Sequence, residues 1–246
     1  METTLLFLAL IPGILIIIFI FRKDKVEHEP WPLIIKLLIF GAISFIPAIF
    51  AEQFMGTVIP ETVDPITFAI SEAFLVAALC EEVCKFLLLS LGSWRNKNFD
   101  YRFDGIVYGV SVAVGFALLE NVMYVMDGGL YVALMRGVLA VPLHAFCGVF
   151  MGVFYGAAKR YSIEGNHSKS LTSILLALIV PMIIHGIYDS LAFLGEYGTT
   201  IILLAFVLFM YIVAIKVVNK FSREDWSAAF YRQNLAGNDA IDGEKY

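Results

Sequence analysis

Hydrophobic positions along this chain form long continuous runs that are separated by short polar connections. The runs cover approximately residues 3–21, 32–54, 66–91, 105–125, 130–157, 171–194 and 199–218. A helix needs about 20 consecutive apolar residues to cross the hydrocarbon core of a bilayer. The pattern therefore predicts an all-α fold, a polytopic bundle of about seven transmembrane helices in a lipid bilayer.

The composition agrees with a membrane protein. Of the 246 residues, 60% are hydrophobic and 16% are charged, whereas a soluble domain is closer to half apolar and a quarter charged. A net charge of −5 gives no support to nucleic-acid binding, and we expect no nucleic-acid partner. The basic residues Arg22, Lys23 and Lys25 follow the first run instead of preceding it, so this run is expected to be a retained anchor.

Lysine and arginine are distributed unevenly over the connections. The connections and tail that contain them are 22–31, 92–104, 158–170 and 219–246. The alternate connections contain acidic residues and neither lysine nor arginine. By the positive-inside rule the N-terminus is outside and the C-terminus is cytoplasmic. We expect residues 1–220 to form one transmembrane domain and residues 221–246 to form a cytoplasmic tail.

Ionisable side chains inside the runs are informative because a charge at the centre of a transmembrane helix costs roughly 2.5–3.5 kcal/mol. The candidates among these residues are Glu72, Glu81, Glu82, Lys85, Glu120, Arg136, His144, His185 and Asp189. At about 1.5 Å per residue, Glu81 and His144 lie within roughly 5 Å of the midpoints of their runs. Such groups persist when they are paired, face water or carry function.

Helical spacing groups several of these side chains. Glu81 and Lys85 are four residues apart and share a face, so the lysine can partly neutralise this glutamate. Glu82 points about 100° away, which predicts different roles for the two glutamates. His185 and Asp189 also share a face, so the carboxylate can orient the imidazole.

Small residues accompany the other two candidate groups. Glu120 ends a stripe of small and apolar residues, and His144 heads a glycine ladder formed by Gly148, Gly152 and Gly156. Small residues allow two membrane helices to approach closely. Both side chains are therefore expected to face a neighbouring helix and not the lipid.

Carboxylates and imidazoles at one depth fit three classes of protein. In a hydrolase, a glutamate activates water while histidines hold a metal or stabilise an oxyanion. In a proton-coupled transporter, the same groups form a relay. In a structural protein, they only join helices. Outside this set, Glu72 is interpreted as a solvated interface residue, and Arg136 as a residue that snorkels outward or pairs with an acid.

Four ordered motifs carry a resemblance to a known family. EEVCK, GFALLEN, PLHAFCG and HGIYD occur in this order, and together they resemble the PrsW family of intramembrane proteases over residues 10–195. The resemblance implies an intramembrane endopeptidase of the bacterial inner membrane that is distantly related to the CAAX prenyl endopeptidases. Its implied substrate is a single-span membrane protein, typically an anti-sigma factor, whose cleavage activates a stress response.

The resemblance also implies roles for individual residues. Glu81 or Glu82 would be the base that activates water, with Glu81 favoured. His144, His185 and Glu120 would bind a zinc ion or stabilise the oxyanion, because the family is described as metalloproteases; a metal-free reaction in which glutamate activates the water is the alternative. Asp189 would orient His185, and Lys85 would adjust the charge of the glutamate pair.

Overall fold

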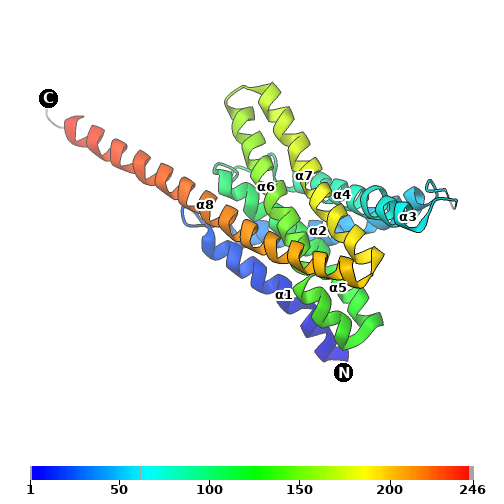
Figure 1. Ribbon diagram of the computed structural model, residues 1–246. Coiled ribbons are helices and arrows are strands. Elements are labelled where there is room, and N and C mark those ends of the chain that lie inside the picture. Colours follow the sequence, from blue (N-terminus) through cyan, green and yellow to red (C-terminus); the bar gives the residue numbers. More distant parts are fainter. Residues whose placement is uncertain (1, 61, 244–246) are drawn as a thin grey trace.

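The computed structural model describes residues 2–60 and 62–243, and every regular element in these ranges is helical. The elements are α1 (Glu2–Lys23), α2 (Trp31–Gly56), α3 (Pro65–Ser71), the π-helix η1 (Glu72–Ala78), α4 (Leu79–Ser93), α5 (Arg102–Val138), α6 (Ala140–Ile163), α7 (His167–Leu194) and α8 (Tyr197–Gly243). The predicted all-α class is confirmed. Figure 1 shows the helices as one bundle, from which the C-terminal part of α8 projects.

Within the described residues, five segments are long and apolar enough to cross a membrane. They are Thr3–Lys23, Trp31–Gly56, Arg102–Ile163, His167–Leu194 and Tyr197–Asp225. The 62-residue segment Arg102–Ile163 contains two of the predicted runs, 105–125 and 130–157. It consists of α5, which bends at Gly129 (φ 70°, ψ −157°), and of α6, which begins two residues after the end of α5. The run at 66–91 is not one of the five, since it is divided into α3, η1 and α4. The total of seven spans stays a prediction, as does the orientation.

Local sequence signals set several helix ends. Asp64 caps α3 by accepting the backbone N–H groups of Ile66 and Thr67, both at 3.1 Å. Asn166 caps α7 in the same way through the N–H of Lys169. Gly195 ends α7 in the left-handed conformation, φ 59°, which glycine adopts without steric cost. A π-helical segment is rare, and here it directly precedes the two glutamates of α4.

The first part of α5 forms the centre of the bundle and is buried almost continuously from Phe103 to Ala117. It packs against α6 through glycines on both helices. A Cβ atom added at Gly105 would lie 2.5 Å from the carbonyl oxygen of Gly152, and one at Gly109 would lie 2.5 Å from that of Gly148. The glycine ladder therefore faces a neighbouring helix, as predicted, and it brings α6 close enough for its histidine to reach α5.

The connection between α1 and α2 contains two buried carboxyl groups outside the membrane spans. Asp24 and Glu29 are 3% and 4% exposed. Burial, together with the negative charge of neighbouring carboxylates such as Asp100, raises the pKa of each to about 7. These values exceed the ordinary 3.8 for Asp24 and 4.5 for Glu29. The folded connection therefore binds protons more tightly than the unfolded one.

This linkage predicts that the connection loses stability as the pH rises. Stabilisation by Asp24 and Glu29 is complete below about pH 4 and is lost as the pH rises through about 7. Hydrogen exchange of residues 24–30, corrected for intrinsic rates, should show about tenfold less protection per group at pH 8 than at pH 6. Glu29→Gln should weaken this pH dependence, whereas Glu164→Gln, at an exposed glutamate at the end of α6, should preserve it. Equal protection at both pH values in the wild type would contradict the linkage.

Candidate active site

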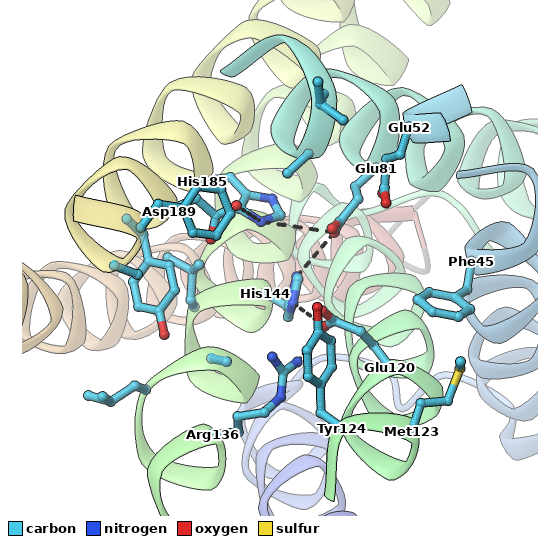
Figure 2. Close-up of a pocket in the computed structure, with 18 of the residues that line it drawn as sticks. Phe45, Glu52, Glu81, Glu120, Met123, Tyr124, Arg136, His144, His185 and Asp189 are labelled. Carbon is cyan, nitrogen blue, oxygen red and sulfur yellow. Dashed lines mark hydrogen bonds and ion pairs between the residues drawn. The ribbon is translucent and has the colours of Figure 1, made fainter. Parts of the chain in front are cut away.

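A cavity of about 540 Å³ opens between α2, η1, α4, α5, α6 and α7. Its wall contains the predicted site residues Glu81, Glu120, His144, His185 and Asp189, each close to the next (Figure 2). These residues come from α4, α5, α6 and α7, which are far apart in the sequence. The structure thus brings together the carboxylates and imidazoles that the sequence analysis selected.

The two glutamates of α4 occupy different positions. Glu81 lines the cavity, whereas Glu82 is fully buried and does not belong to the cavity wall. The ammonium group of Lys85 donates to Glu81 Oε2 at 2.9 Å and to Glu82 Oε1 at 2.8 Å. Lysine therefore pairs with both glutamates, and not only with the one that shares its helical face.

His144 is held at both ring nitrogens. Its Nε2 lies 2.9 Å from Glu120 Oε2, and its Nδ1 lies 3.1 Å from the ammonium group of Lys85. An ammonium group can only donate, so Nδ1 accepts the hydrogen bond from Lys85. The proton of the neutral ring is then on Nε2, from which it is donated to Glu120.

His185 is also placed between two carboxylates. Its Nδ1 lies 2.9 Å from Glu82 Oε1, and its Nε2 lies 3.2 Å from Asp189 Oδ2. The predicted contact with Asp189 is present. The two imidazole rings lie edge to face, with 5.1 Å between their centroids. The histidines are therefore oriented by neighbours that fix their ring planes.

Four residues offer ligand atoms to one point. One oxygen or nitrogen atom from each of Glu81, Glu82, His144 and His185 lies within 4.8 Å of the others. Glu82 Oε2 is buried without a hydrogen-bond partner, so it has a free lone pair for a cation. Carboxylate oxygen and imidazole nitrogen are ligands that divalent metals such as zinc accept.

The same donors already surround a cation of the chain. Lys85 Nζ contacts Glu81, Glu82 and His144, three of the four converging residues, and lies 4.0 Å from the ring centroid of Phe116. The donor set fits a metal ion when this ammonium group withdraws from between the ligands. Glu120 contacts His144 and is not among the four, so the predicted ligand set of His144, His185 and Glu120 stays a prediction.

Three other residues of the cavity wall bear on the interpretation of the sequence. Arg136 Nη2 lies 2.7 Å from Glu120 Oε2, which confirms the interpretation that it pairs with an acid. Glu52 of α2 also lines the cavity, although it was not among the candidate residues selected from the sequence. The sequence signal that could have identified Glu52 was its position inside the hydrophobic run at 32–54. Glu72 of η1 also lines the cavity and is half-buried.

Comparisons with known proteins identify the family of this chain. Residues 29–216 match the family model described as "PrsW family intramembrane metalloprotease". The chain is 35% identical over 178 residues to Protease PrsW of Bacillus subtilis, which covers 72% of this chain and 78% of that protein. It is 33% identical over 204 residues to Protease PrsW of Oceanobacillus iheyensis, covering 83% and 89%. No solved structure matches the chain significantly. The chain belongs to the PrsW family of intramembrane metalloproteases.

Proposed function

We propose that this protein hydrolyses a peptide bond of a single-span membrane protein, with Glu81 as the base that activates water. The observation that carries the proposal is the position of the Glu81 carboxylate. It lines a cavity large enough for several waters, and both site histidines have a ring nitrogen 3.9 Å from it. A general base must lie within reach of the water it deprotonates.

The reaction begins with transfer of a proton from water to the Glu81 carboxylate. The oxygen of this water forms a bond to the scissile carbonyl carbon, and the carbonyl oxygen becomes an oxyanion. The proton on Glu81 then passes to the amide nitrogen as the carbon–nitrogen bond breaks, which leaves a carboxylic acid and an amine, and the acid then loses its proton to water. His144 and His185 face this position and are assigned to metal binding or to stabilisation of the oxyanion.

A zinc ion, held by His144 and His185 with Glu82 or the predicted Glu120, would supply a Lewis acid for the carbonyl oxygen. The support is the converging donor set and the free Glu82 Oε2. Lys85 has a second role in this proposal, since its ammonium group neutralises the glutamates in the absence of the ion. In a metal-free reaction, the Lys85 ammonium group would stay between the glutamates and neutralise them throughout.

The substrate is proposed to be an anti-sigma factor of a bacterial inner membrane. The support is membership of a family whose curated relatives are bacterial. The proposed topology has seven membrane segments, an external N-terminus and a cytoplasmic C-terminus, with residues 1–220 as the protease domain and 221–246 as the tail. A substrate helix must unwind locally before attack, because its carbonyl groups are already hydrogen-bonded.

The test is purified protein in liposomes with a tagged single-span substrate. We expect cleavage of the substrate by the wild type, detected by mass spectrometry of both fragments, and no proton flux that depends on a solute. A proton-coupled transporter built from the same groups would give flux without cleavage, and this outcome would overturn the proposal.

A further inference from the structure

Arg136 belongs to the short helical segment that follows the bend of α5 at Gly129. Its side chain is 18% exposed and lines the cavity on the side of Glu120 (Figure 2). A guanidinium group at this depth is costly unless it is paired. Its partners therefore show what holds it there.

The guanidinium group contacts three residues from the part of α5 that precedes the bend. Nη2 lies 2.7 Å from Glu120 Oε2, and Nε donates to Asn121 Oδ1 at 3.1 Å. The guanidinium carbon lies 4.1 Å from the ring centroid of Tyr124, a cation–π distance. These contacts, an ion pair, one hydrogen bond and a cation–π contact, hold the guanidinium group beside Glu120.

Asn121 connects this group to another helix. It is fully buried, and its Nδ2 donates to the carbonyl oxygen of Ala9 in α1 at 2.9 Å. With the amide nitrogen used in this way, Oδ1 is directed toward Arg136. Asn121 is therefore anchored to α1 and accepts a hydrogen bond from Arg136, and Arg136 in turn pairs with the carboxylate of Glu120.

A single carboxylate oxygen joins this arrangement to the active site. Glu120 Oε2 lies 2.9 Å from His144 Nε2 and 2.7 Å from Arg136 Nη2. An arginine beside the carboxylate limits its rotation. A carboxylate fixed in this way accepts the Nε2 proton of His144, and the Nδ1 of the ring then faces Lys85 at 3.1 Å and Glu81 Oε2 at 3.9 Å.

We propose that Arg136, supported by Asn121, is a positioning residue that holds Glu120 and, through it, the tautomer and orientation of His144. The inference rests on the proposed protease function and adds a role that acts through another residue. Arg136 itself does not contact the reacting atoms in this assignment. Its effect is therefore expected on the turnover step and not on substrate binding.

The first test compares Arg136→Gln, Arg136→Lys and Arg102→Gln in the liposome assay. Arg136→Gln should lower kcat about 10–100-fold, in the range found when partners of active-site histidines are removed, with KM within about twofold of the wild type. Arg136→Lys should recover part of the loss, because it restores the charge but not the planar pair of contacts. Arg102→Gln is the matched control, since Arg102 also pairs with a glutamate and lies over an aromatic ring, at the other end of α5.

The second test asks whether Arg136 acts through Glu120. Glutamine at Glu120 keeps an acceptor oxygen for His144, so this variant is expected to be slowed and still measurable. The double variant Arg136→Gln/Glu120→Gln should be no slower than Glu120→Gln alone, because residues that act as one unit have non-additive effects. Fully multiplicative losses, or a rise in KM alone, would overturn the positioning role.

Asn121→Ala keeps the proposal testable if Arg136→Gln does not fold. It removes one contact of the guanidinium group and should lower kcat several-fold, with KM unchanged. Wild-type kcat in a folded Asn121→Ala protein would show that Arg136 needs no support. A wild-type protein that cleaves no substrate would instead refute the protease function, so the two failures are distinguishable.

Discussion

Glu81→Gln is expected to lower the rate of substrate cleavage at least about a thousandfold while membrane insertion remains normal. Glutamine has nearly the same shape but cannot take a proton from water, and general-base catalysis contributes about 10²–10⁴ to a rate. The side chain lines the cavity and is 7% exposed, so the substitution creates no large void. The measurement is single-turnover cleavage in liposomes, together with the amount of protein extracted from the membrane.

Two further variants make this result specific. Glu82→Gln should also abolish cleavage, because it removes a partner of both Lys85 and His185. Glu164→Gln is the matched control, since this glutamate is exposed and pairs with Arg160 at the end of α6. If Glu81→Gln cleaves at the wild-type rate, Glu81 is not the base.

Lys85→Met is expected to strengthen zinc binding at least about tenfold. The ammonium group lies 2.8–3.1 Å from Glu82, Glu81 and His144, so a cation that enters between these donors must displace it. Without a cation, the buried carboxylates are left unpaired, which typically costs 3–5 kcal/mol. The metal-free variant should therefore unfold at a lower temperature, and zinc should restore its stability. Competition with a zinc indicator dye and thermal unfolding with and without zinc measure both effects.

Two further variants serve as controls for metal binding, one at a candidate ligand and one at a lysine outside the site. His185→Ala should weaken zinc binding about 100-fold, because it removes one of four converging donors. Lys36→Met should leave it unchanged, since that ammonium group donates to the carbonyl oxygen of Gly92 at 3.0 Å, outside the site. Equal zinc affinity in Lys85→Met and the wild type would show that lysine and metal do not compete.

The sequence predicted much of this arrangement because the membrane limits what ionisable groups can do. Long apolar runs indicated an all-α bundle, and titratable residues inside them indicated a buried polar site. Glycines at Gly148 and Gly152 predicted the close contact of α6 with a neighbour, which the structure confirms against Gly105 and Gly109. These inferences depend on local spacing, which one sequence records directly.

The remaining features depend on contacts between distant residues. Glu82 and His185 are 103 positions apart, and their hydrogen bond follows from the packing of α4 against α7. The contact of Lys85 with His144, 59 positions away, is of the same kind. The division of the run at 66–91 was also not predictable from hydropathy, because a π-helix is stabilised by its surroundings.

Because of the π-helix η1, the relative direction of the Glu72 and Glu81 side chains depends on the winding and the number of the residues between them. In an α-helix, nine residues at about 100° each amount to two and a half turns, which would place these side chains on opposite faces. Both nevertheless line the same cavity, because the wider winding of Glu72–Ala78 changes the rotation between them. Insertion or deletion of a single residue here would turn Glu81 away from the cavity without altering any side chain of the site.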